Sequence, residues 1–441
     1  MKTPTLLFLA LTTLLPAQEK TKDPFIKEKK APEAAQPAEQ NTNVTFLVES
    51  FILPQADFTA WMDMPGGREK LHEKVLAAVK VGTAKLDACH FARGKSGSRF
   101  TLDSVDELAY PNEWSPADTK GFQYPVSFDT KLTGDRLEME PTANPSGTAL
   151  DLNQSFERTR FNGLRAAKAD RTLPGIVVAD FHEQRSLANI SVWLRTPTLI
   201  SAHSVEEGQM ALNFVTPRLL PIMQPTQVPP MGAGNITLTP RVISLERMLA
   251  WELLQKHGEN GPALLAALKP MIADQKAVLE HLSTVKTKSG IRVRHEAVRQ
   301  HSYATEFDPP TEGKPAQPAD DPKKKDTPAK PPAQAGAAVI DCRLIGFNWE
   351  VEVVLNEKEH LIDTNIMFEH AAFAGNFADP LWNEYYPDYP VFSSQKITTS
   401  CTQAAGSTIL LSTLNPPGDT GVNGRKDEGR VWLLFLEESF E

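Results

Sequence analysis

The chain has 441 residues, of which 41% are hydrophobic and 23% charged, as is ordinary for proteins that fold around packed cores. Its formal net charge of −9 argues against nucleic acid as a partner, because binding to phosphates requires a basic surface. The sequence contains no Walker loop, dinucleotide fingerprint, Gly-x-Ser-x-Gly elbow or Cys-x-x-Cys pair, so we expect no cofactor and no enzyme. His182-Glu183 starts like a zinc-protease motif, but Ser186 occupies the place of the second histidine.

The N-terminal residues have the pattern of an export signal. Lys2 precedes an apolar run that ends at Leu15, and small residues follow, which predicts a signal peptide over residues 1–17. Residues 18–42 are rich in Lys, Glu, Ala, Pro and Gln and are expected to form a disordered tether. We therefore expect an exported protein in the periplasm, in the outer membrane or outside the cell. No later stretch predicts a transmembrane helix.

Residues 43–220 are predicted to form a first folded unit that consists mainly of strands. Alternating apolar and polar residues predict the strands, and an apolar stripe predicts one helix at residues 68–81. Residues 110–116 are expected to form an irregular loop. The strands are expected at residues 44–49, 84–91, 98–110 and 126–131, in a hairpin at 137–163, and at 190–194, 198–204 and 210–215.

The hairpin at residues 137–163 recurs in diverged form at residues 349–375. Nine of the 27 positions are identical without a gap, whereas unrelated stretches share about one in fifteen. This indicates an internal duplication with the hairpin as the core of each repeat. The two hairpins carry the same acidic and amide residues on one face: Glu138, Glu140, Asp151 and Asn153, and Glu350, Glu352, Asp363 and Asn365.

A second unit at residues 236–441 is predicted to follow a Pro/Gly-rich linker at 221–235. An insertion rich in Pro, Lys and Asp at residues 310–336 is expected to be disordered. The helix of this unit is expected at residues 263–279. The expected equivalences with the first unit are 243–246 with 46–49, 288–290 with 95–97, 303–309 with 110–116, Asp341 with Asp129, Gly346 with Gly134, 391–402 with 193–204 and Gly406 with Gly208.

The three cysteines do not form a disulfide framework. A bridge between Cys342 and Cys401 and a set of free thiols are both compatible with the sequence. The spacing of these two residues and Cys89 does not indicate a metal site.

Several motifs of the second unit follow one another in a recognisable order: Ser289-Gly290, residues 302–310, residues 346–353, residues 363–375, and residues 390–400 with the sequence PVFSSQKITTS. This order resembles the C-terminal domain of secretins, the ring-forming outer-membrane channels of type II and type III secretion and of type IV pilus systems. The chain is most similar to divergent secretin-like proteins of Verrucomicrobia-type bacteria, duplicated in tandem. The two repeats together cover most of the chain.

The resemblance implies a β-rich α+β fold of two tandem secretin-like units, each a mainly antiparallel sheet with one or two helices. It also implies a non-enzymatic envelope protein of a secretion or type IV pilus system, whose partners are proteins or further copies of itself. Such a protein would assemble through exposed strands. The family's closing signature, Val-Pro-x-Leu-Gly-x-Ile-Pro-x-Leu-Gly, and its N-terminal ring-building modules are missing, so we expect an assembly protein without a complete pore.

The acidic faces of the two hairpins allow different interpretations. Their oxygen atoms are ligands that suit calcium. A strand with one face in water shows the same alternation without any ligand, and this is the simpler account. Acid–base catalysis is not favoured because no pocket or histidine partner can be inferred. A hydrolase is therefore only the third functional alternative.

An aromatic run that is specific to the second repeat contains Trp382, Tyr385, Tyr386 and Tyr389. Such rings with acidic neighbours suit stacking on a sugar or an interface with a protein. Packing of a proline-stiffened loop is the simpler account. The second functional alternative is thus a secreted protein that binds a glycan or a protein through this loop.

Overall fold

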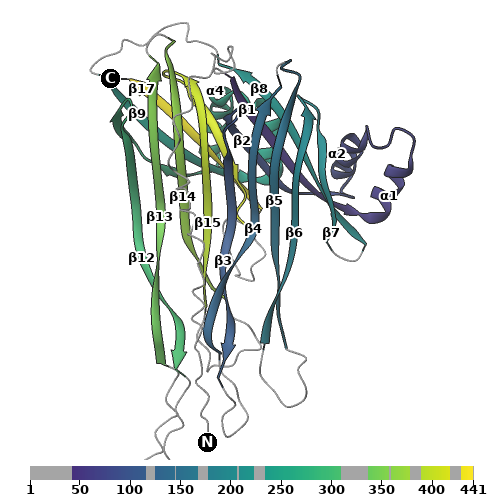
Figure 1. Ribbon diagram of the computed structural model, residues 1–441, viewed down its shortest axis with the longest axis vertical. Coiled ribbons are helices and arrows are strands. Elements are labelled where there is room, and N and C mark those ends of the chain that lie inside the picture. Colours follow the sequence, from purple (N-terminus) through teal and green to yellow (C-terminus); the bar gives the residue numbers. More distant parts are fainter. Residues whose placement is uncertain are drawn as a thin grey trace, which may run out of the picture. The chain divides into compact units, whose positions relative to one another are not determined.

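The computed structural model describes residues 42–115, 125–144, 146–166, 177–205, 208–222, 234–308, 336–356, 359–377, 389–417 and 429–440 (Figure 1). These residues belong to one compact unit, Asn41–Glu441. They form two antiparallel sheets and four helices, which confirms the predicted β-rich α+β class.

The first sheet, called sheet A, has nine strands in the order β10-β9-β17-β16-β2-β1-β8-β7, with β11 beside β9. The strands are β1 (Thr42–Pro54), β2 (Lys85–Lys95), β7 (Thr198–Ser204), β8 (Gln209–Pro221), β9 (Asn235–Glu246), β10 (Ala277–Leu282), β11 (Val285–Lys288), β16 (Thr408–Leu414) and β17 (Arg430–Phe440). Two helices follow β1 and two follow β9: α1 (Gln55–Asp63), α2 (Leu71–Val81), α3 (Arg247–His257) and α4 (Gly261–Ala273).

The second sheet, called sheet B, has eight longer strands in the order β12-β13-β14-β15-β3-β4-β5-β6. The strands are β3 (Phe100–Trp114), β4 (Pro125–Ala143), β5 (Ala149–Ala166), β6 (Val177–Trp193), β12 (Arg292–Asp308), β13 (Gly336–Asn356), β14 (Leu361–Phe377) and β15 (Tyr389–Ala404). In Figure 1 these strands run side by side along the long axis of the picture.

Strand β1 explains how the layers are held together. Phe46 and Val48 are buried in the core between the two sheets, whereas Leu47 and Phe51 are buried in the core between sheet A and the helices. Successive side chains of a strand point to opposite faces, so a strand covered on both faces is apolar at nearly every position. Sheet A is therefore the middle layer, with sheet B on one face and the helices on the other.

Each sheet contains strands from both halves of the chain, where one sheet for each half was expected. Strand β15 pairs with β3 from Val391↔Leu108 to Thr398↔Thr101, and β16 pairs with β2 at Ser412↔Ala92. Buried backbone N–H and C=O groups need hydrogen-bond partners. The edges of β3 and β2 obtain these partners from β15 and β16, which lie in the other half of the chain. We call the two pairings together the seam.

Two stretches that were predicted to be irregular loops are strands. Residues 110–114 belong to β3 and residues 303–308 belong to β12. The register shifts between Pro111 and Glu113 and between Ala304 and Glu306 show a bulge in each stretch. A bulge accommodates a proline because the residue there does not need to donate to the ladder.

The helix predicted at residues 263–279 is shorter and ends at Ala273. Gln275 has a φ of 61°, which reverses the chain, and β10 then pairs with β9. Helices α1 and α3 were not predicted. The side chain of Glu246 caps α3 by accepting hydrogen bonds from two backbone N–H groups of its first turn.

Several predictions concern residues outside the described ranges: the signal peptide, the tether up to residue 41, residues 223–233 of the linker and residues 309–335 of the insertion. None of the helices in the described ranges combines the length and the apolar character needed to cross a membrane.

All three cysteines are free, with Cys89 and Cys401 buried and Cys342 exposed. Of the two alternatives for Cys342 and Cys401, the structure shows free thiols. Strand β14 lies between the strands that carry these two residues. Two strand spacings amount to about 10 Å, which is beyond the reach of a disulfide.

Candidate functional site

The strand registers of residues 42–221, the first half, recur in residues 235–440, the second half. Tyr110 faces Asp129 across β3 and β4, and Tyr303 faces Asp341 across β12 and β13. These registers agree with the predicted equivalence of Asp129 and Asp341.

Gly134 and Gly346 occupy matching positions in β4 and β13, as their predicted equivalence requires. Their φ angles are 120° and 131°. A Cβ atom at Gly134 would lie 2.3 Å from the backbone oxygen of Ser104, and one at Gly346 would lie 2.2 Å from that of Ala297. Both the backbone conformation and the close approach of the facing strand therefore require glycine.

The spacing-based match of Gly406 with Gly208 is wrong. Gly208 precedes β8 and accepts a backbone hydrogen bond of 2.8 Å from Gln55, the first residue of α1. Gly429 precedes β17 and accepts one of 2.9 Å from Arg247, the first residue of α3. Gly429 is therefore the counterpart of Gly208. The spacing misled because the connection before β17 is longer than the one before β8.

Two other spacing-based matches are shifted for similar reasons. Strand β15 corresponds to β6 in topology, so residues 391–402 do not match residues 193–204. The turn at Gly406 then corresponds to the turn at Arg195, and both residues have positive φ angles, of 76° and 59°. The end of β9 corresponds to the end of β1, so residues 243–246 correspond to residues beyond 46–49.

The glutamates of both hairpins lie on sheet B beside an arginine at the start of the facing strand, since Arg99 directly precedes β3 and Arg292 is the first residue of β12. Arg99 contacts the two glutamates of the first hairpin at 3.0 and 3.3 Å. Arg292 contacts the two of the second hairpin at 3.1 Å each. The eight predicted hairpin residues are Glu138, Glu140, Asp151, Asn153, Glu350, Glu352, Asp363 and Asn365.

The hairpin aspartates also bind neighbouring strands. Asp151 accepts a hydrogen bond of 2.6 Å from Ser191 Oγ, and Asp363 forms an ion pair with Lys95. The carboxylates are thus distributed along the strands and do not converge on one point. Within the described ranges, no group of three or more His, Cys, Asp or Glu side chains is arranged to hold a metal ion.

The aromatic run falls mostly outside the described residues. Trp382, Tyr385 and Tyr386 lie outside the described residues, and Tyr389 is the first residue of β15.

The seam between the halves is buried and rich in hydrogen bonds. Thr413 Oγ1 accepts a bond of 2.7 Å from the backbone N–H of Phe91. Arg343 of β13 donates to both carboxylate oxygens of Glu107 in β3, at 3.0 and 2.7 Å, and also contacts Glu369 at 2.9 Å. The seam therefore joins the halves through backbone pairing, buried hydroxyl groups and an ion-pair cluster.

The second half helps to bury residues of the first half whose counterparts are exposed at the outer edge of sheet A. By register, Leu279 and Leu282 in β10 correspond to Leu86 and Cys89 in β2. Leu279 and Leu282 are 42% and 52% exposed, whereas Leu86 and Cys89 are 4% and 0% exposed. The outer edge thus presents apolar side chains at positions that are covered in the first half by the core that it shares with the second half.

The opposite edge shows the same contrast. Strand β16 is buried from Ile409 to Leu414, whereas its counterpart β7 is half-buried or exposed along its whole length. In sheet B, β15 is buried from Pro390 to Gln395, whereas every second residue of β6 from Glu183 to Trp193 is exposed. Figure 1 shows β12 and β6 at opposite borders of sheet B, and β12 also pairs with β4 near its C-terminal end, at Glu306↔Ser127.

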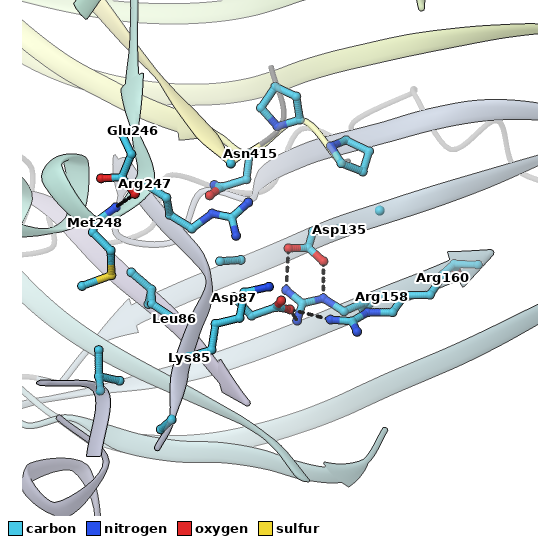
Figure 2. A pocket seen from close by; sticks show the side chains of 18 of the residues that line it. Lys85, Leu86, Asp87, Asp135, Arg158, Arg160, Glu246, Arg247, Met248 and Asn415 are labelled. Carbon is cyan, nitrogen blue, oxygen red and sulfur yellow. Dashed lines mark hydrogen bonds and ion pairs between the residues drawn. The ribbon is translucent and has the colours of Figure 1, made fainter. Parts of the chain in front are cut away.

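A cavity of about 790 Å³ lies beside the seam and is lined by both halves of the chain (Figure 2). Lys85 and Glu246, which line it, are exposed, so the cavity is open to solvent. Its other labelled residues are Leu86, Asp87, Asp135, Arg158, Arg160, Arg247, Met248 and Asn415.

One wall of the cavity carries a buried ion-pair network. Arg158 donates through Nε and Nη2 to the two oxygens of Asp135, at 2.5 and 2.7 Å, and His90 contacts Asp135 at 2.8 Å. Asp87 accepts from Arg158 at 2.5 Å and from Arg160 at 2.6 Å. Burial raises the pKa of Asp135, but Arg158 and then His90 outweigh burial and hold that pKa well below its usual value.

Arg247 enters the cavity from the start of α3. Figure 2 shows its guanidinium directed toward the side of the cavity that carries Asp135 and Arg158. Its Nε atom is buried and has no hydrogen-bond partner in the described part of the chain. The wall opposite the ion-pair network therefore offers a hydrogen-bond donor.

The ion-pair network was not predicted, although the sequence contains a signal for it. Asp135 lies two residues before Leu137 and four before Met139, and Arg158 lies two residues after Phe156, so both charges fall on the apolar side of their strands. A charge on an apolar face indicates a buried pair, because an unpaired buried charge is strongly unfavourable. The cavity itself requires residues distant in the sequence.

No family model and no curated protein matches the chain. Among solved structures, it is similar to the Klebsiella pneumoniae type II secretion system outer membrane complex of PulD, PulS and the PulC HR domain, at 11% identity over 42% of this chain and 41% of that chain, with a TM-score of 0.22. It is also similar to the type II secretion system secretin GspD of E. coli K12, at 10% identity over 41% and 48%, with a TM-score of 0.18. The ETEC pilotin–secretin complex AspS–GspD matches at 8% identity over 90% and 49%, with a TM-score of 0.23. The chain therefore spans less than half the length of the solved chains it matches.

Proposed function

We propose that this protein is a non-enzymatic structural protein of the cell envelope that assembles by pairing its sheet edges with further copies of itself. The observation that carries the proposal is the exposure of Leu279 and Leu282 at an outer edge, whereas the corresponding residues of the first half are buried in a core that includes residues of the second half. A second molecule that binds as the second half binds the first would cover both leucines.

The internal seam supplies the geometry of the proposed contact. We infer that the two halves are diverged copies of one unit, so that β6 and β7 of one molecule meet β12 and β11 of the next. If the register of β15 and β3 is carried over, Asp180 faces His301 of the second molecule and Arg185 faces Glu296 of the second molecule. The opposite charges of Arg185 and Glu296 favour this register over a shifted one.

The proposed contact joins two different surfaces, so its repetition forms either a closed ring or an open filament. A closed ring leaves no unpaired strand edge, and this supports the ring. The proposed location is the periplasm or the outer membrane, and the proposed partners are proteins of a secretion system or type IV pilus. The proposal includes export by residues 1–17 but no complete pore.

Cysteine crosslinking tests the register in a Cys342→Ser background, which removes the exposed thiol. Leu187→Cys combined with Arg294→Cys places thiols at facing positions of the proposed contact. After oxidation we expect a ladder of covalent oligomers on a non-reducing gel.

Two matched pairs serve as controls. Thr398→Cys with Thr101→Cys, which face each other in the seam, should crosslink within one chain and produce no ladder. Leu187→Cys with Gln300→Cys is out of register and should crosslink poorly. A monomer in sedimentation experiments that forms no ladder, and that binds a glycan through Trp382 and Tyr386, would replace this proposal with the secreted binding protein.

A further inference from the structure

We propose that the cavity beside the seam binds a carboxylate carried on an apolar body, with Arg247 as its principal contact. The site lies within one chain, so it does not depend on association between molecules.

The carboxylates that line the cavity already have partners. Asp135 accepts from Arg158 and His90, and Asp87 accepts from two arginines. The side chain of Glu246 accepts from two backbone N–H groups of α3. The hydrogen-bonding group that lacks a partner in the described structure is a donor, the buried Nε of Arg247. The cavity therefore suits a ligand that carries a hydrogen-bond acceptor.

The charges that line the cavity also favour an anion. Its lining contains four cationic side chains and three carboxylates: Lys85, Arg158, Arg160 and Arg247, and Asp87, Asp135 and Glu246. The buried Nε–H of Arg247 is unfavourable without an acceptor, because a buried donor that lacks a partner keeps its desolvation cost. A ligand carboxylate relieves this, since its two oxygens match the fork of guanidinium N–H groups.

The size and the remaining lining indicate what carries the carboxylate. A volume of about 790 Å³ is that of a small-molecule site and exceeds what an inorganic anion fills. Apolar side chains complete the lining: Val79, Leu86, Met248, Pro416 and Pro417. A fatty acid and the C-terminal residues of an apolar peptide share the required chemistry.

Isothermal titration of the full-length protein at pH 7 tests the site with three probes. These are octanoate, an N-acetylated Ala-Leu-Leu peptide with a free carboxylate, and the same peptide as its C-terminal amide. We expect at least one carboxylate to bind. Arg247→Gln should raise its dissociation constant about ten-fold or more, because a charge-assisted hydrogen bond is lost. Binding of octanoate alone identifies a lipid source, and binding of the peptide acid but not its amide identifies a peptide source.

Lys256→Gln is the matched control, because Lys256 is an exposed cation on the same helix. This variant should bind the probes like the wild type. Thermal unfolding of unliganded Arg247→Gln shows whether it is folded, and Arg160→Gln provides a second variant of the same cavity. The proposal is wrong if neither carboxylate binds at millimolar concentration, or if folded Arg247→Gln binds as tightly as the wild type. Sedimentation of the same proteins reports separately on self-association.

Discussion

Asp135 and Arg158 face each other directly across the β4–β5 ladder and are joined by two hydrogen bonds of 2.5 and 2.7 Å. Both side chains are buried, on the strand faces that also carry the buried side chains of Leu137, Met139 and Phe156. The pair extends through Asp87 to Arg160 and so forms one wall of the cavity. An ion pair in this position makes the packing of the two sheets depend on both partners.

Arg158→Met should destabilise the protein by about 3–5 kcal/mol, because it leaves the buried carboxylate of Asp135 without its main partner. Urea unfolding measures this free energy. Arg99→Met is the matched control on the exposed surface of the same sheet and should change stability by less than about 1 kcal/mol. If both substitutions lowered the free energy of unfolding equally, burial would not explain why the Arg158 ion pair stabilises the fold.

Glu438 is buried and accepts a hydrogen bond of 2.8 Å from Thr364. Burial raises its pKa from 4.5 to about 7. The folded protein therefore holds a proton that the unfolded chain releases between these values, and the contribution of Glu438 to stability falls as the pH rises from about 4.5 to 7. Glu438→Gln should remove this decline, which amounts to at most about 3 kcal/mol. Urea unfolding at a series of pH values provides the test, and an unchanged slope in the variant would refute it.

His370 packs against Phe347 and Trp432, with ring centroids 4.1 and 4.8 Å away. Burial and then the charge of His281 lower its pKa from 6.5 to about 4. Its neutral form therefore stabilises the fold above pH 6.5, and this contribution is lost as the pH falls toward 4. His370→Phe should reduce the loss of unfolding free energy that occurs as the pH falls from 6.5 toward 4. The contribution of His370 to stability rises with pH, whereas that of Glu438 falls with pH. The two variants can therefore be distinguished in one series of measurements.

Gly134→Ala should destabilise the protein by at least about 2 kcal/mol, because it combines an unfavourable φ with a clash against a backbone atom. Gly147→Ala is the matched control, with a φ of 63° and open space around the added Cβ. It should cost about 1 kcal/mol, from the backbone conformation alone. Comparable melting temperatures for the two variants would contradict this prediction and show that the facing strand moves away to accommodate the added Cβ atom at residue 134.

Leu282→Glu should abolish self-association and leave the unfolding free energy nearly unchanged, because Leu282 is exposed at the outer edge of sheet A. Light scattering after size-exclusion chromatography measures the molecular mass. Val81→Glu is the control, an even more exposed apolar residue at the end of α2. Loss of association in both variants would indicate nonspecific hydrophobic contact, and loss in neither would place the contact elsewhere.

Local patterns in the sequence predicted many of the elements correctly. The hairpin at residues 137–163, the helix at 68–81 and the strand at 198–204 were found because alternation, helical period and turn residues act over a few positions. Pro111 was interpreted as a loop signal because a bulge depends on the facing strand, which the sequence does not display. The eight hairpin residues were located on one strand face, but their arginine partners were not anticipated.

The sequence by itself determined the β-rich class, the hairpins and the positions of several glycine turns, since each depends on neighbouring residues. Only the tertiary structure decided that β15 pairs with β3, that Asp135 and Arg158 are buried together, and that Leu279 and Leu282 remain uncovered. These features depend on strands that lie up to hundreds of residues apart in the chain. Which distant strands share hydrogen bonds is settled by the packing of whole sheets, because every strand edge carries the same backbone donors and acceptors.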